Sequence, residues 1–199
     1  MAQLSLLGRD EPRFDEDFSR LERVTLSDGA WLDLQPGWLR GHERVFEALE
    51  RTTRWRTEER QMYERVVDVP RMFAVLPDDG PGHPILLAIR RALSAHYATE
   101  FVRTSLALYR DGRDSVALHG DYVARRMQEA LVATVSVGAP RRFLVKSAEG
   151  GSSLALSLGW GDLLVMGGSA QRTHRHGVPK VAHADPRIAI MFRPEWPAP

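Results

Sequence analysis

His119 and Asp121 are the residues whose types and spacing most directly suggest chemistry in this chain. One residue separates them, so on an extended strand both side chains would leave the same face. A third candidate ligand lies far along the chain, in the segment QRTHRHGVPK, which contains His174 and His176. Two histidines and one carboxylate leave coordination positions open, which suits a non-haem Fe(II) that must bind oxygen and a co-substrate. Spacing alone does not choose between His174 and His176, because both would share one strand face.

Two arginines follow in the segment DPRIAIMFRPEW. Arg187 and Arg193 stand six residues apart on a run of alternating apolar residues. An even separation keeps both guanidinium groups on one face of a strand, the geometry needed to grip a dicarboxylic acid at both ends. Upstream, Tyr109 precedes His119 by ten residues, across a turn built on Asp111–Gly112. The structural alternative is that both arginines lie on the surface of an edge strand.

These motifs together resemble the AlkB-like family of Fe(II)- and 2-oxoglutarate-dependent oxygenases. The match runs from about Trp31 to about Trp196. The elements that carry it are a Tyr-x-Asp-Gly turn from Tyr109, H-x-D from His119, the strand end Ser136–Gly138, the strand GDLLVMGG, H-x-V-P-K from His176 and R-x-x-x-x-x-R from Arg187. The resemblance implies Fe(II) as the metal, with 2-oxoglutarate and O2 as co-substrates.

The resemblance also implies roles for individual histidines. It assigns His119, Asp121 and His176 as the catalytic iron ligands, because the family's second histidine is the one just before the x-V-P-K segment. His174 is then expected in the pocket wall, where the family more often has an aromatic residue.

For 2-oxoglutarate, the resemblance implies a salt bridge from Arg187 to the distal carboxylate, helped by Tyr109, with Arg193 near the keto-acid end. Two positions depart from the family pattern: Ala107 and Ala189 stand where asparagines usually help to hold the co-substrate. Because charged contacts outweigh neutral ones, this predicts a weaker or rearranged co-substrate site that is still present.

On the substrate side, the segment from Trp55 to Arg71 matches the nucleotide-recognition lid of relatives, within about residues 53–80. Substrate contacts are expected from Trp55, Tyr63, Arg71 and Arg125. Trp55, Tyr63 or Phe73 would stack on a flipped base, although an aromatic residue of this kind is more often part of the core than a stacking platform.

Nucleic-acid repair enzymes of the family often carry a second acid two residues after the metal-binding aspartate. Here that position is Val123. The arginine pairs 125–126 and 141–142 either contact phosphate or simply solvate a turn and a strand edge, and the sequence leaves both readings open.

Composition sets the broad class. A chain of 199 residues, 43% of them hydrophobic, is enough for one domain with a sizeable core. There is no cysteine, so the sequence allows no disulfide and no thiolate metal site. The formal net charge is only +1 and no apolar run approaches a membrane span. We expect a cytoplasmic protein that does not enter membranes and is monomeric.

The pattern of elements predicts a mostly β protein with flanking helices. Residues 1–26 have few apolar anchors and are expected to form a loosely ordered extension, followed by a single domain over 27–199. Residues 30–34 alternate like a strand, and residues 41–52 and 83–97 have helical spacing. From Phe101 onward, short β-runs separated by turns indicate an antiparallel sandwich or barrel. The resemblance implies a double-stranded β-helix, a jelly roll, with the helices buttressing one sheet.

The functional hypothesis is Fe(II)- and 2-oxoglutarate-dependent oxidative demethylation of N-alkylated bases. Targets such as 1-methyladenine and 3-methylcytosine in DNA, or in RNA, would be restored with release of formaldehyde, succinate and CO2. One alternative is an oxygenase acting on a small molecule, a modified RNA or a protein side chain. Another is a non-catalytic protein that binds alkylated nucleic acid.

Overall fold

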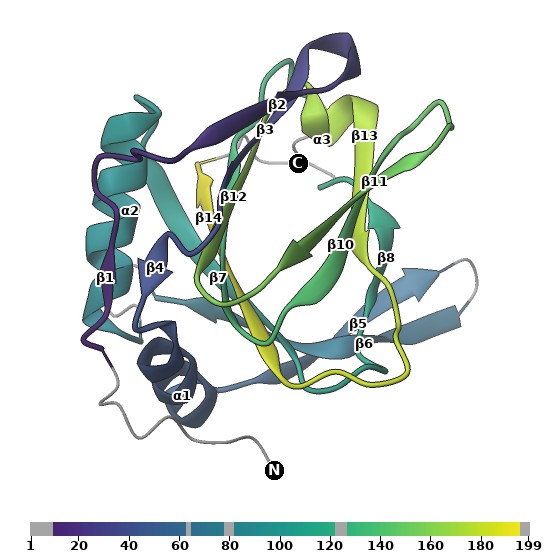
Figure 1. Cartoon of the computed structure of the whole chain (residues 1–199). Helices are drawn as coiled ribbons and strands as arrows, with labels where there is room; N and C mark the ends of the chain where they lie inside the picture. Colours follow the sequence, from purple (N-terminus) through teal and green to yellow (C-terminus); the bar gives the residue numbers. More distant parts are fainter. Residues whose placement is uncertain (1–9, 63–64, 78–81, 122–126, 196–199) are drawn as a thin grey trace.

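Strands dominate the computed structural model, which describes residues 10–62, 65–77, 82–121 and 127–195 (Figure 1). In chain order the elements are β1 (Arg13–Phe14), β2 (Glu22–Thr25), the 3-10 turn η1 (Ser27–Gly29), β3 (Ala30–Gln35), β4 (Leu39–Arg40), α1 (His42–Thr52), β5 (Arg56–Met62), β6 (Arg65–Leu76), α2 (Pro84–His96), β7 (Phe101–Tyr109), β8 (Val116–His119), β9 (Val132–Gly138), β10 (Arg141–Ser147), β11 (Ser153–Leu158), β12 (Asp162–Gly168), α3 (Ala170–Thr173), β13 (His174–Val178) and β14 (Arg187–Pro194). The expected strand at 30–34 and the expected helices at 41–52 and 83–97 are confirmed as β3, α1 and α2.

Two antiparallel sheets make up the body of the protein. Within the described residues, the larger sheet has the order β2-β3-β12-β9-β14-β7-β6-β5, and the smaller has the order β11-β10-β13-β8. The two sheets face each other as a jelly roll, and Figure 1 shows α1 and α2 on the side of the larger sheet away from the smaller one. The predicted fold class is confirmed.

Successive side chains of a strand point to opposite faces, so β14 contributes both to the core beneath the helices and to the space between the sheets. In β14, Ile188, Ile190 and Phe192 are fully buried in the core that includes the helices' apolar faces. The intervening odd positions, from Arg187 to Arg193, point instead into the space between the sheets. The outer face of β14 therefore supports the fold, and its inner face is left for the site.

Helix α2 is held in place by its start and its apolar face. Pro84 occupies the first turn, where its missing N–H costs nothing, and the His83 side chain accepts a hydrogen bond from the backbone N–H of Ile85. Leu86, Ile89 and Leu93 are buried against the larger sheet.

The N-terminal segment is more ordered than we expected. The expectation of a loosely attached extension does not hold for residues 10–26, because β1 pairs with β4 and β2 pairs with β3. Phe18 is buried and stacks on His96 at a ring-centroid distance of 3.9 Å. The aromatic side chains of Phe14 and Phe18, together with two short strands, thus attach a segment whose composition looks unstructured.

A buried carboxylate fixes this attachment. Asp33 on β3 is 2% exposed and accepts two hydrogen bonds from Arg23 on β2, at 2.6 and 2.7 Å. It also accepts a 3.0 Å hydrogen bond from the Tyr97 hydroxyl at the end of α2. The carboxylate therefore joins β2, β3 and α2.

The segment expected to form a lid is a long antiparallel hairpin. Strand β5 pairs with β6, and β6 pairs with β7, so the hairpin extends the larger sheet at its edge. Its role as a nucleotide-recognition lid stays a prediction.

Candidate functional site

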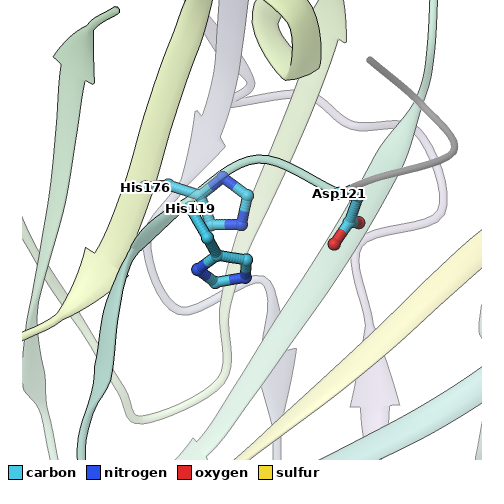
Figure 2. A group of neighbouring side chains, drawn as sticks. All are labelled: His119, Asp121 and His176. Carbon is cyan, nitrogen blue, oxygen red and sulfur yellow. The ribbon is translucent and has the colours of Figure 1, made fainter. Parts of the chain in front are cut away.

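The three candidate ligands meet on the inner face of the smaller sheet. His119 ends β8 and lies directly opposite His176 on β13 in the antiparallel register, so both rings leave the same face. Asp121 lies just beyond the end of β8 and turns back toward them, and Figure 2 shows the two rings one above the other with the carboxylate beside them. One donor atom from each residue lies within 4.8 Å of the others.

The hydrogen bonding of His119 fixes which nitrogen can bind a metal. Its Nδ1 lies 2.8 Å from the carbonyl oxygen of Ala117. Because a carbonyl can only accept, Nδ1 carries the proton and donates, which leaves the lone pair on Nε2. A backbone carbonyl in this position is the usual support of a metal-binding histidine.

Electrostatics keep the cluster in the form that binds metal. Burial, with the neighbouring His119 second, lowers the pKa of His176 to about 3, so its ring is neutral at pH 7. Burial alone would raise the pKa of Asp121, but the charge of Arg193 and the hydrogen bond that Arg193 donates help to hold it below its usual value. Neutral imidazoles and an ionised carboxylate are the protonation states that a metal requires.

Arg193 contacts the candidate ligand set directly. Its Nε donates to Asp121 Oδ2 at 3.1 Å, and its Nη1 donates to the Ser105 hydroxyl at 2.8 Å. One oxygen of Asp121 is therefore bound by Arg193, which orients the carboxylate. Ser105 was not predicted, although it shares the even spacing of residues 107 and 109 on one strand face.

Arg187 forms a second, buried end of the site. It is 1% exposed, its Nη2 donates to Ser136 Oγ at 2.6 Å, and its guanidinium carbon lies 5.4 Å from the centre of the Tyr109 ring. The Tyr109 hydroxyl accepts a 3.3 Å hydrogen bond from Arg71. Burial lowers the pKa of Arg187 to about 10, which still leaves it charged at pH 7.

The surroundings of Arg187 are those of a binding site for an anionic ligand. In the described part of the chain Arg187 forms no ion pair with a carboxylate, and its Nε has no hydrogen-bond partner. A buried guanidinium without a counter-ion is costly, so the geometry favours a ligand carboxylate here.

One cavity of about 370 Å³ joins the two ends. The three candidate ligands lie along the smaller sheet, and Tyr109, Arg187 and Arg193 lie along the larger. The size and the convergence of charged groups are those of a small-molecule site. A chelating acid with a distal carboxylate would fit between the His-Asp-His cluster and Arg187.

Comparison with known proteins agrees with this chemistry. The chain matches the 2OG-Fe(II) oxygenase superfamily over residues 35–193. The chain belongs to the 2OG-Fe(II) oxygenase superfamily. Membership confirms the expected Fe(II), 2-oxoglutarate and O2, and the donor set suits the metal because two imidazoles and a carboxylate leave coordination positions open.

Within this superfamily of oxygenases the chain is similar to AlkB proteins, as its motifs indicated. It is 29% identical over 159 residues to alpha-ketoglutarate-dependent dioxygenase alkB homolog 3 of Bos taurus, and 28% identical over 159 residues to that of Homo sapiens. Each match covers 75% of this chain and 53% of the relative, so the chain spans about half the length of these relatives.

Solved structures show the same fold at low identity. OsALKBH1 aligns with a TM-score of 0.59 and 15% identity, covering 87% of this chain and 100% of that one. A prolyl hydroxylase from Trichoplax adhaerens, solved with a hypoxia inducible factor peptide, aligns with a TM-score of 0.64 and 13% identity over 85% and 83% of the two chains.

The structure distinguishes His176 from His174, which the spacing of the two histidines could not do. His176 is in the cluster, whereas the buried His174 bonds Thr173 Oγ1 through Nδ1 at 2.8 Å. His174 does not line the cavity, so its expected place in the pocket wall is wrong.

The predicted substrate residues of this oxygenase divide into three groups. Arg71 and Phe73 line the cavity. Trp55 does not: its indole N–H donates to the carbonyl of Glu50 at 3.1 Å and its ring packs against the helix-side core, which argues against a substrate contact. Tyr63 and Arg125 lie outside the described residues.

Arg141 does not contribute to an exposed basic strand edge, which was one of the two readings that the sequence left open. It is 2% exposed, and its guanidinium donates to the carbonyls of Asp111, Asp114 and Pro179 at 2.8, 2.8 and 3.1 Å. It therefore holds three chain segments together and is not available to phosphate, whereas Arg142 is exposed.

The two departures from the family pattern fall on a single cross-strand pair. Ala189 on β14 lies opposite Ala107 on β7, and both are buried. Ser136 on β9 flanks Ala189 on its other side and binds Arg187. The site thus keeps a hydroxyl beside Arg187, although two amide side chains of the family pattern are absent.

In the described part of the chain, no helix is long and apolar enough to cross a bilayer.

Proposed function

We propose that the protein is a nucleic-acid dealkylase that oxidatively removes N-methyl groups from bases such as 1-methyladenine and 3-methylcytosine. One observation carries the proposal: the His-Asp-His cluster and the buried Arg187 face one cavity from opposite sheets. The similarity to alkB homolog 3 proteins supports the choice of substrate class.

Residue roles follow from the contacts. His119 Nε2, Asp121 and His176 would hold the metal, and Arg193 would keep the Asp121 carboxylate ionised and oriented. Arg187, positioned by the Ser136 hydroxyl and the Tyr109 ring, would bind the distal carboxylate of 2-oxoglutarate. When bound, iron supplies the oxidation, in which O2 converts 2-oxoglutarate to succinate and CO2 and hydroxylates the methyl group.

The methylated base must leave the base stack of the nucleic acid before it can react. The cluster lies inside a cavity between two sheets, so a methylated base reaches it only when flipped or single-stranded. Phe73 and Arg71 line the cavity on the β6 side, where an aromatic face and a guanidinium would contact the base. The proposed contacts of Tyr63 and Arg125 are supported by the sequence alone. The hydroxymethyl product then releases formaldehyde and a proton, and the electron pair of the broken C–N bond returns to the ring nitrogen of the restored base.

The decisive experiment is turnover with defined oligonucleotides. The protein, Fe(II), 2-oxoglutarate and O2 are incubated with an oligonucleotide carrying 1-methyladenine or 3-methylcytosine, and succinate, formaldehyde and product mass are measured. We expect stoichiometric succinate and formaldehyde, with loss of the methyl group. An unmethylated oligonucleotide and the His176→Ala variant are the controls.

The other outcomes distinguish the alternatives. Succinate release that no alkylated oligonucleotide stimulates would favour a small molecule, a modified RNA or a protein side chain as substrate. Tight binding of alkylated oligonucleotide without succinate release would favour the non-catalytic binder.

A further inference from the structure

The outer face of the smaller sheet is basic and free of acidic groups. Its four strands contain no Asp or Glu, although the chain has 26 such residues. Alternation turns Phe143, Val145 and His176 inward, so Arg142, Lys146 and Arg175 point outward. We call these three residues the outer basic face.

The arrangement of the outer basic face is electrostatically unfavourable by itself. Lys146 and Arg175 lie directly opposite each other in the register of β10 and β13. Like charges in directly opposite positions destabilise a sheet. Neither residue forms an ion pair with a described carboxylate, and Glu149 in the following turn does not pair with Lys146.

Two other cross-strand pairs of basic residues have a carboxylate nearby. Arg13 lies opposite Arg40, and Arg103 lies opposite Arg193. In those pairs a carboxylate lies near: Asp10 at 4.0 Å from Arg13, Glu195 at 2.7 Å from Arg103, and Asp121 at 3.1 Å from Arg193. Among cross-strand basic pairs of the described residues, only Lys146 and Arg175 have no carboxylate partner.

Protection of a sheet edge does not explain these charges. Proteins place lysines on edge strands to prevent edge-to-edge aggregation. The edge strands here are β11 and β8, whereas Lys146 and Arg175 lie on the two central strands. Their neighbours on β11, Ser153, Ala155 and Ser157, are small and exposed, and Arg142 and Arg175 are themselves exposed, whereas Lys146 is half-buried beside Leu144.

We infer that the outer basic face binds the sugar-phosphate backbone of the nucleic-acid substrate; this inference rests on the proposed function. Arg142 and Lys146 are four residues apart on one strand, about 13 Å, so the two side chains can contact different phosphates of one nucleic-acid strand. Arg175 immediately precedes His176, so the face lies directly behind the His-Asp-His cluster. A strand with one base in the cavity reaches it by crossing the β8 edge, two strand spacings or about 10 Å from β10.

Replacing Lys146 and Arg175 by neutral residues distinguishes binding of the sugar-phosphate backbone from a structural role of these two charges. The double variant Lys146→Gln/Arg175→Gln removes the repulsion, so its melting temperature should equal or exceed that of the wild type. Its affinity for a fluorescein-labelled, unmethylated single-stranded oligonucleotide should fall about tenfold at low salt. The slope of log affinity against log salt should decrease by about 1.4, the loss expected for two phosphate contacts.

The matched control is Arg20→Gln/Arg91→Gln. Both arginines are exposed, and they lie on the β1–β2 connection and on α2, which packs on the far face of the larger sheet. This variant changes the net charge equally and should leave affinity and slope near wild-type values. Anisotropy is measured on the full chain with Mn(II) and 2-oxoglutarate, so that binding is read without turnover.

If both double variants bound the oligonucleotide equally weakly, the inference would be overturned, because the loss of affinity would then follow from net charge alone. Wild-type affinity in the Lys146/Arg175 variant would overturn it too. Binding of the wild type to phosphatidylserine vesicles but not to the oligonucleotide would assign the face to another partner. Failure of the proposed function appears separately, as absence of oligonucleotide-stimulated succinate release.

Discussion

Replacement of Arg187 by methionine tests the co-substrate end of the site most directly. Burial lowers the pKa of this guanidinium to about 10. Each pKa unit corresponds to about 1.4 kcal/mol, so keeping Arg187 charged costs the ligand-free protein about 3 kcal/mol. Methionine removes that cost and loses the hydrogen bond to Ser136, worth about 1 kcal/mol. We expect Arg187→Met to unfold with a free energy about 2 kcal/mol higher than that of the ligand-free wild type.

The same substitution should nearly abolish co-substrate binding. Removing one partner of a buried ion pair costs about 3–5 kcal/mol, so the affinity for 2-oxoglutarate should fall by about two to almost four orders of magnitude. Urea unfolding and thermal melting, each with and without Mn(II) and 2-oxoglutarate, measure both effects. Arg187→Lys is the control, because it keeps the buried charge but loses the planar fork.

The reasoning would be refuted by the opposite combination of results. A ligand-free Arg187→Met protein that unfolds at lower urea than the wild type would show that Arg187 is already compensated within the fold. Undiminished stabilisation of that variant by 2-oxoglutarate would show that the distal carboxylate binds elsewhere.

Four further substitutions test the remaining assignments. His176→Ala should abolish both metal binding and turnover, whereas His174→Ala should keep most of each; metal titration and succinate release give the answer, and swapped results would reverse the ligand assignment. Burial raises the pKa of Asp121 and the charge of Arg193 opposes it, so in Arg193→Met this carboxylate should protonate at a higher pH. As the pH falls, Mn(II) binding should therefore be lost earlier than in the wild type, and an unshifted profile would exclude this role. Asp33→Ala should lower the free energy of unfolding by about 3 kcal/mol in urea titrations, because it leaves the arginine and tyrosine that it binds without their acceptor.

Local pattern predicted the parts of the site that depend on strand alternation. The even spacing of Arg187 and Arg193 placed both on the inner face of β14, and the alternation of β7 placed Tyr109 on the same face, beside Arg187 in the register. The separation of His119 and Asp121 brought both to one cluster, although Asp121 lies beyond the end of the strand. In each case the relevant physics lies within a few residues of the chain.

Other features depended on contacts between distant segments. His174 and His176 share a strand face, and only the pairing of β13 with β8 puts His176 opposite a second histidine. Arg141 looked like a surface charge because its three carbonyl partners lie 27 to 38 residues away in sequence. Trp55 looked like a stacking platform because its place in the sequence did not show that its ring would pack against the core on the helix side of the larger sheet.

The division of the site between the two sheets has a mechanical consequence. The metal-binding cluster belongs to the smaller sheet and its continuation, and Arg187 belongs to the larger. A short diacid anchored at both ends would be a second polar link between two layers that are otherwise joined by apolar side chains and by the ion pair of Arg193 with Asp121. Amide protons of β13 and β14 should then exchange more slowly together when the co-substrate binds, because opening either layer would break the same link.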